Sequence, residues 1–220
     1  MRDLVELTGM VIKSASVGEY DKRLVILTRE RGRITAFARG AKRPGNSLMG
    51  PSRPFAFGTF KLFEGREAYN LHGAEITQYF EELVMDIEGA CYGQYFLEFA
   101  DYYSRENLNG EALLLLIYQS LRALLKPSIP NPLVRRIFEL KAMVLNGEYT
   151  ERPPKSVSDS AGYTWEFVVF SPIEKLYTFA VTDEVFREFS QCVEINQKRY
   201  VDRDFHSLEI LGTLLSTGAQ

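Results

Sequence analysis

The chain is 220 residues long, with 45% hydrophobic and 25% charged residues and a formal net charge of -3. This composition excludes a disordered chain and suits one large domain or two modest ones. No apolar run approaches the roughly 18 residues that a membrane helix needs. The first ten residues also lack the apolar core of a secretory signal, so we expect a cytoplasmic protein with no membrane partner.

The charge is unevenly distributed along the chain. Residues 1–66 carry 13 of the 26 Lys and Arg residues but only 6 of the 29 Asp and Glu residues, which gives this part a net charge of +7 and the remainder -10. A basic segment joined to an acidic one is typical of proteins that contact nucleic acid, although it also occurs in chains whose halves attract each other.

Residues 28–43 concentrate the positive charge, with six cations around a single acid, Glu30. If residues 33–39 form a strand, its side chains alternate between two faces, so Ile34, Ala36 and Ala38 share one face. The opposite face then holds Arg33, Thr35, Phe37 and Arg39. A small apolar row suits a barrel interior, and cations around a flat ring suit a nucleic-acid strand. An ordinary solvated strand face is the alternative.

Five β-rich runs precede Gly73. They cover residues 4–14, 24–28, 33–38, 55–63 and 69–72. The connection at residues 39–53 is rich in Gly and Pro and carries Lys42, Arg43 and Arg53, which predicts a mobile basic arm. Five short strands with glycine at the corners favour a small closed barrel of the oligonucleotide-binding (OB) type, with an SH3-like barrel as the alternative.

After Gly73 the apolar period changes from two to 3.6 residues, which predicts a helical bundle. We expect its helices at residues 76–87, around 92–99, at 111–126 and at 132–146. A loop at 148–162, a β-hairpin formed by 164–170 and 175–181, a helix capped by Thr182 and a last helix over 204–215 should follow. The predicted fold is α+β, with a barrel domain over residues 1–74 and a helical domain over residues 75–220 that contains the loop and hairpin at 148–181.

The sequence nominates no catalytic group and no cofactor site. His72 and His206 have no second ligand at a helical or hairpin spacing, and Cys91 and Cys192 fall within helical patterns as small apolar residues would. Nucleotide-binding glycine motifs and nucleophile motifs are absent from the sequence. We therefore expect a protein that is not an enzyme and that holds no metal or other cofactor.

Four stretches within residues 4–147 resemble the RecO family of bacterial recombination mediators. They are GMVIKSASVGEYDKRLVILTRERGRITAFARGAKRPGNSL, PFAFGTFKLF, YGQYFLEFADYYS and LVRRIFELKAMVLNG. The resemblance implies a protein that binds single- and double-stranded DNA, anneals complementary strands and, with RecR, helps RecA displace the single-strand-binding protein SSB.

The chain departs from this family after the LNG stretch, where many members place a four-cysteine zinc module. The corresponding segment, GEYTERPPKSVSDSAGYTWEFVVFSPIEKLYTF, contains no cysteine. We therefore expect no stoichiometric zinc, and we expect the hairpin to be held by packing of Trp165, Phe167, Tyr177 and Phe179.

The expected DNA-contact residues lie in the basic amino-terminal part, because Arg and Lys neutralise phosphates. They are Arg23, Arg29, Arg31, Arg33, Phe37, Arg39, Lys42, Arg43 and Arg53. For Phe37, base stacking and packing at a barrel end are both open. The alternative function is a non-catalytic scaffold whose barrel binds RNA or a protein.

The resemblance also implies a docking site for the acidic SSB tail in the helical domain. On the helix at residues 133–146, Arg136 and Lys141 lie among apolar residues, as a tail with acidic groups and an aromatic end requires. Lys141 simply extending to water along its own stem is the alternative. Arg135 instead should form an exposed pair with Glu139 at i+4.

Overall fold

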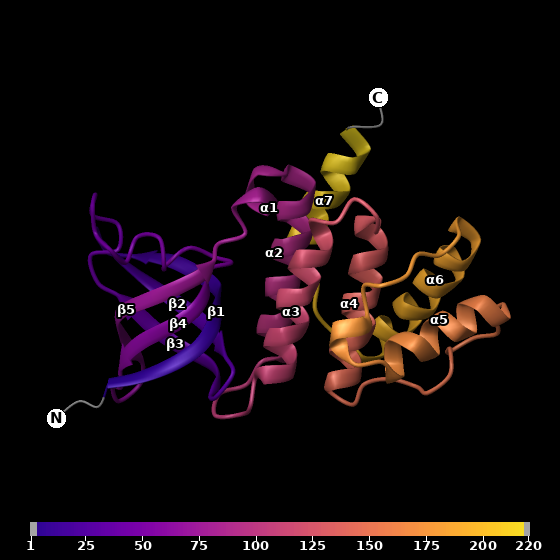
Figure 1. Cartoon of the computed structure of the whole chain (residues 1–220), viewed down its shortest axis with the longest axis horizontal. Coiled ribbons are helices and arrows are strands. Elements are labelled where there is room, and N and C mark those ends of the chain that lie inside the picture. Colours follow the sequence, from indigo (N-terminus) through magenta and orange to yellow (C-terminus); the bar gives the residue numbers. More distant parts are fainter. Residues whose placement is uncertain (1–3, 218–220) are drawn as a thin grey trace. The chain divides into compact units, whose positions relative to one another are not determined.

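The computed structural model describes residues 4–217, and Figure 1 shows their ribbon. Five strands form a closed barrel in the order β1-β2-β3-β5-β4. Their bounds are β1 Leu4–Val17, β2 Asp21–Thr28, β3 Gly32–Ala38, β4 Phe57–Phe63 and β5 Tyr69–Gln78. Neighbouring strands are antiparallel except β3 and β5, which pair in parallel at Ala36 and Phe37. The five-stranded barrel confirms this part of the predicted fold.

The barrel interior is filled by the alternating apolar residues that the sequence predicted. Ile34, Ala36 and Ala38 of β3 are buried, whereas Thr35 and Phe37 between them are only half-buried. Phe60 and Leu62 of β4 join the same core. Each large apolar side chain that is fully removed from water contributes roughly 1.5–3 kcal/mol, so the period-two pattern specifies which face of each strand is inside.

One compact unit combines the barrel with Ala100–Leu114. This segment lies along the loop between β2 and β3, where Arg33 N–H donates to the Arg105 carbonyl at 3.0 Å and Gly110 N–H donates to the Arg29 carbonyl at 2.9 Å. Gly32 has φ +62°, and a Cβ there would lie 2.3 Å from the Arg105 carbonyl oxygen, so this turn requires glycine.

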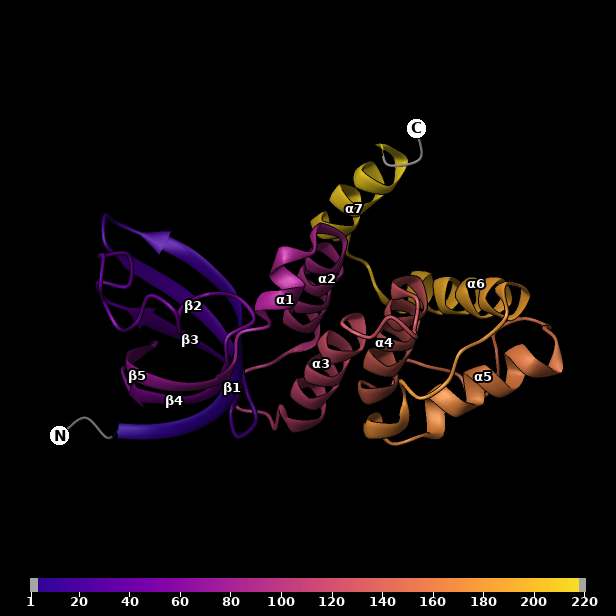
Figure 2. The ribbon, with the colours of Figure 1, turned by 45° about the horizontal axis from the view of Figure 1, so that its top comes forward.

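The second compact unit is helical and comprises residues 82–99 together with those from Leu115 onward. The helices of the chain are α1 Glu81–Met85, α2 Ile87–Tyr103, α3 Glu111–Leu124, α4 Asn131–Leu145, α5 Asp159–Phe170, α6 Asp183–Tyr200 and α7 His206–Thr217, with a 3-10 turn at Ile173–Lys175. Helices α4, α5 and α6 pack against one another, as Figure 2 shows. Within the described residues, no helix is long and apolar enough to cross a membrane.

The predicted helix at residues 76–87 is wrong in its first half. Ile76 lies in β5, where it faces Gly58 of β4, and helix α1 begins only at Glu81. Phe80 separates the two elements because its φ of +53° belongs to neither a strand nor a right-handed helix. The prediction failed because the apolar residues at the end of β5 and those of α1 happen to be spaced as on one face of a single helix.

The predicted hairpin at 164–170 and 175–181 is also wrong. Residues 159–170 form helix α5, and no strand lies between residues 148 and 182. The helix buries Ala161, Trp165, Val168 and Val169, which recur at helical spacing. Ser158 caps its start by accepting a hydrogen bond from Ala161 N–H at 3.3 Å. Tertiary burial of this stripe outweighs the β propensity of the run TWEFVVF.

Candidate nucleic-acid interface

The basic loop, residues 39–53 between β3 and β4, is an ordered chain of tight turns. The N–H groups of residues 41, 43, 46, 49, 53 and 56 each donate to the carbonyl three residues earlier, at 2.9–3.4 Å. Ala41 and Leu48 of this loop are buried in the barrel core. The predicted mobile arm is therefore wrong, because Gly and Pro here form successive turns that are anchored by apolar residues.

Three cations come together where the basic loop meets the start of β2. The pKa of Lys22 is lowered, first because the residue is partly removed from water and then because Arg53 and Lys42 are close to it. Like charges held close together are stabilised by a bound anion, which removes their mutual repulsion. Lys22, Lys42 and Arg53 thus form a place where a phosphate would be favoured.

Tyr20, in the turn before β2, carries one of the loop cations on its ring. The Arg43 guanidinium carbon lies 4.6 Å from the centre of the Tyr20 ring, and Lys42 N–H donates to the Tyr20 carbonyl at 2.9 Å. Tyr20 remains 41% exposed. A cation above an accessible flat ring offers both charge and a stacking surface.

The outer face of β2 and β3 adds a second aromatic residue with a neighbouring cation. Arg23 of β2 lies opposite Phe37 of β3, and Arg23 is exposed while Phe37 is half-buried. Arg39 follows directly after β3 and is exposed at the start of the basic loop. The predicted outer face is therefore confirmed for Arg33 and Phe37, which alternate with the buried residues of β3, whereas Arg39 lies in the loop after the strand.

The remaining three predicted cations have acidic partners within the barrel unit. Arg29 pairs with Glu30 at 3.0 Å, Arg31 with Glu64 at 3.1 Å, and Arg33 Nε lies 3.5 Å from Asp101 Oδ1. Arg31 also donates to the Tyr69 hydroxyl. Because their charges are locally compensated, these arginines attract an external phosphate less than the loop cations do.

Six cations of β2 and the basic loop form no salt bridge with any described residue, and we call them the unpaired cations. They are Lys22, Arg23, Arg39, Lys42, Arg43 and Arg53. Sequence reasoning missed Lys22 and the ring of Tyr20. The position of Lys22 in the strand opposite Ala38, beside the basic loop, is the signal that could have identified it.

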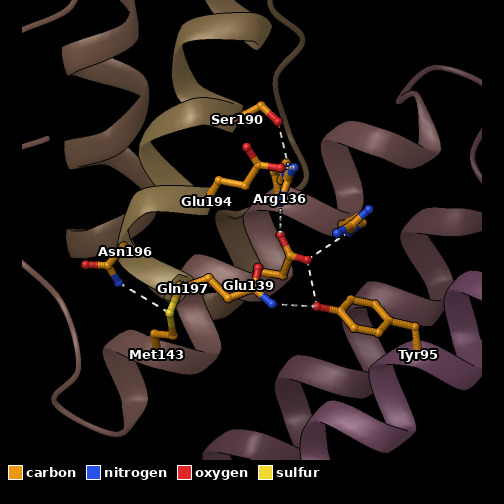
Figure 3. Close-up of polar contacts among 9 residues, drawn as sticks. Tyr95, Arg136, Glu139, Met143, Ser190, Glu194, Asn196 and Gln197 are labelled. Carbon is orange, nitrogen blue, oxygen red and sulfur yellow. Dashed lines mark hydrogen bonds and ion pairs between the residues drawn. The ribbon is translucent and has the colours of Figure 1, made fainter. Parts of the chain in front are cut away.

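Arg136, predicted to bind the SSB tail, belongs to a buried polar network of the helical unit (Figure 3). Its guanidinium donates to Glu139 at 2.9 Å, Ser190 at 2.7 Å and Glu194 at 3.1 Å, and the residue is 8% exposed. Glu139 is fully buried and also accepts from the Tyr95 hydroxyl at 2.6 Å.

Arg135 completes this network, because it donates to Glu139 at 2.8 Å. The predicted i,i+4 pair of Arg135 and Glu139 is present, but its predicted exposure is wrong, since the carboxylate is inside the bundle. Burial alone would raise the pKa of Glu139, but Arg135, Arg136 and the Tyr95 hydrogen bond together hold that pKa below its ordinary value. Glu139 is a buried anion with two cationic partners.

Lys141, the other residue predicted for the tail, closes the end of α5. Its ammonium group donates to the carbonyls of Val168 at 3.2 Å, Val169 at 2.9 Å and Ser171 at 2.7 Å, and the residue is 6% exposed. A cation at the carboxyl end of a helix satisfies its last carbonyls and complements its dipole. As placed, neither Arg136 nor Lys141 is available to a peptide unless an internal bond breaks.

The polar residues that could bind a metal are scattered. Among the described residues, no three His, Cys, Asp or Glu side chains gather as a ligand set. His72 packs edge-on against Phe63 at 5.1 Å, and His206 lies 3.3 Å from Glu209. Burial raises the pKa of both Cys91 and Cys192, which keeps these thiols protonated.

The closed barrel with a basic, aromatic-bearing end, followed by a helical unit, defines a class of proteins that join a small OB-type barrel to a helical bundle. Two family models then match specific parts of the chain, "Recombination protein O N terminal" over residues 1–80 and "Recombination protein O C terminal" over residues 85–151. The chain belongs to the RecO family of DNA repair and recombination proteins.

Individual relatives support this assignment. The chain is 33% identical over 144 residues to the DNA repair protein RecO of Alkaliphilus metalliredigens and 36% identical over 145 residues to that of Symbiobacterium thermophilum. These matches cover 66% of this chain but only 58% and 57% of those relatives. A more distant match, 22% identical, covers 96% of this chain and 97% of the DNA repair protein RecO of Acetivibrio thermocellus.

Proposed function

We propose that the protein is a recombination mediator that binds single- and double-stranded DNA, anneals complementary strands and helps to load RecA on DNA coated by SSB. The observation that carries the proposal is the set of six unpaired cations beside the exposed ring of Tyr20 and the half-buried ring of Phe37. Membership of a DNA repair family supports it.

The chemistry of annealing needs no covalent step. Lys and Arg replace the counterions around the phosphates, so binding should be independent of sequence and should weaken as salt rises. Two strands held on one cationic surface repel each other less, which favours pairing of complementary bases. We therefore assign the protein a non-catalytic role in the cytoplasm, with no cofactor.

SSB and RecR are the protein partners that we propose on the basis of the family resemblance. For the SSB tail, the residues to test are Arg136 and Lys141, although each already has internal partners. A labelled acidic tail peptide should be titrated into wild type, Arg136→Ala and Lys141→Ala, with Arg187→Ala, at an exposed arginine of α6, as the control. Equal affinity in all four would remove this pair of residues from the proposed SSB site.

The direct test of the proposed function is annealing of complementary oligonucleotides that are coated with SSB. The protein should accelerate duplex formation at low salt and lose this effect as salt rises. Competition by single-stranded DNA, RNA and heparin separates this function from that of an RNA- or protein-binding scaffold. Strong binding to RNA alone, with no acceleration of annealing, would contradict the proposal.

A further inference from the structure

A groove of about 620 Å³ lies in the helical unit between helix α5 and the segment that leads into α6. One wall consists of Tyr163, Thr164 and Phe167 of α5, and the other is the segment of residues 178–182. The groove lies beyond residue 151, where the match to the carboxyl-terminal family model ends. It is separate from the barrel that carries the proposed DNA contacts.

The groove has an aromatic surface that water reaches. Phe167 and Phe179, one from each wall, pack edge-on with ring centres 5.1 Å apart, and the Tyr163 ring centre lies 6.4 Å from that of Phe167 along α5. Among these groove residues, Tyr163 is 70% exposed, and Phe167 and Phe179 are half-buried. Three aromatic residues that water still reaches, gathered on one groove, indicate a surface that another molecule covers.

The second wall is a strand-forming sequence without a strand partner. Residues 175–181, KLYTFAV, have the composition of a β-strand, but the run that could pair with them is folded into α5. Within the described residues, the N–H and C=O groups of Phe179, Ala180 and Val181 form no hydrogen bond, and Ala180 is exposed. Unpaired backbone beside an apolar groove is what an added peptide strand recognises.

The charge at the groove selects the partner. Asp159 is the one charged residue among the described residues that line it, and Asp183 and Glu184 follow directly after the wall formed by residues 178–182. No described Lys or Arg lines the groove. An incoming peptide is therefore favoured if it carries Lys or Arg and disfavoured if it is acidic.

We propose that this groove binds an extended, cationic segment of a partner protein, which pairs with the backbone of Phe179–Val181, packs alternate apolar side chains on the aromatic surface and places a Lys or Arg beside Asp159. The interaction is independent of the DNA-binding function proposed above. It would give the helical unit a protein partner whose charge is opposite to that of an acidic tail.

Two synthetic nine-residue peptides test the proposal, one alternating Val with Lys and the other alternating Val with Glu. Fluorescence anisotropy should show binding of the Lys peptide to the full chain and at least tenfold weaker binding of the Glu peptide. Ala180→Pro removes one N–H donor and should weaken binding of the Lys peptide about tenfold, whereas Ala180→Ser, which keeps the N–H group, should not.

Asp159→Lys provides a test that does not alter the segment, and Glu174→Lys, outside the groove, is the charge-matched control. Asp159→Lys should weaken binding of the Lys peptide at least fivefold, while Glu174→Lys should change it less than twofold. Circular dichroism checks that each variant is folded.

Equal binding by wild type, Ala180→Pro and Asp159→Lys would overturn the proposal, as would tighter binding of the Glu peptide. Sedimentation showing a dimer that Ala180→Pro abolishes would assign the groove to a second copy of the chain and would also overturn it.

Discussion

Glu139 is the residue on which the polar interior of the helical unit depends. It is fully buried, and its carboxylate joins Tyr95 of α2 to Arg135 and Arg136 of α4, while Arg136 reaches α6 through Ser190 and Glu194 (Figure 3). Removing one member of such a network leaves the others buried without their partner. Glu139 and its partner Arg136 therefore connect three helices.

Replacing Glu139 with Gln should lower the free energy of unfolding by about 3–5 kcal/mol, because two cations lose their common anion. Urea unfolding at pH 7 measures the change. Glu209→Gln is the matched control, since Glu209 contacts only the exposed His206 among the described ion pairs, and it should change stability by less than about 0.5 kcal/mol. A loss below about 1 kcal/mol for Glu139→Gln would show that the network is not needed.

The same residue predicts a dependence on pH. Because the folded-state pKa of Glu139 is lowered, its ionisation contributes stability above the ordinary carboxyl pKa of about 4.3, and this contribution is lost as pH falls through the lowered folded value. The stability difference between wild type and Glu139→Gln should therefore stay constant near neutral pH and shrink in acid.

Phe37 allows base stacking to be separated from packing. Phe37→Leu keeps apolar volume opposite Arg23 but removes the flat ring. If the ring stacks on a base, affinity for single-stranded DNA should fall by about 1 kcal/mol, and affinity for duplex should change less. Fluorescence titration with both DNA forms decides this. Unchanged affinity for the single strand would leave Phe37 as a packing residue.

At the scale of elements, helix α5 shows what local sequence preference could not determine. The run TWEFVVF favours a strand, yet Trp165 is buried within a helix and donates to the Thr150 carbonyl at 3.0 Å. The helical spacing of Ala161, Trp165 and Val168 was present in the sequence. The local sequence could not show that the ammonium group of Lys141 caps the end of this helix, because Lys141 is 27 to 30 residues away from the carbonyls that it caps.

Lys141→Met should therefore destabilise α5 selectively. Three carbonyls lose their donor, which we expect to cost about 2 kcal/mol in the free energy of unfolding. Hydrogen exchange should accelerate in α5 more than in α3, and urea unfolding gives the total loss. Lys175→Met, at an exposed lysine, is the control. Equal exchange in α5 of wild type and Lys141→Met would contradict the capping role.

The basic loop is a second element that the sequence described only in part. Its cations were predicted correctly as exposed, because Lys42, Arg43 and Arg53 all lie at the surface. Its order was missed, because the burial of Ala41 and Leu48 depends on the open end of a barrel that forms from distant strands. Ordered cations lose less conformational entropy on binding a phosphate than cations on a mobile arm.

For the whole molecule, the spacing of apolar residues and the distribution of charge along the chain were enough to predict a barrel followed by helices. Strand alternation located the buried face of β3 and β4, since it depends only on neighbouring residues. The pairing of Arg31 with Glu64 and of Arg33 with Asp101 was not predictable, because these partners are far apart in sequence. That pairing is what separates Arg29, Arg31 and Arg33 from the unpaired cations.

The metal content of the protein is a further property that can be predicted for the whole molecule. We expect less than 0.1 zinc per chain after dialysis, because the described Cys and His side chains do not form a ligand set. Elemental analysis measures this, and the urea midpoint should be the same with and without a chelator. One zinc per chain that resists dialysis would contradict the expectation.

The most direct test of the DNA-binding surface compares two triple variants that remove the same total charge. One is Lys42→Ala, Arg43→Ala and Arg53→Ala, whose cations have no salt bridge in the described chain. The other is Arg29→Ala, Arg31→Ala and Lys61→Ala, whose cations pair with Glu30, Glu64 and Glu75. The measurement is the dependence of log affinity for single-stranded DNA on log salt.

If the unpaired cations hold the phosphates, the first triple variant should flatten the salt dependence by about two units, because each lost phosphate contact removes about 0.7 for a single strand. The second should change it by less than half a unit. Equal slopes for both variants would mean that net charge alone governs binding. A larger effect of the second variant would place the DNA on the other side of the barrel and contradict the surface proposed for this protein.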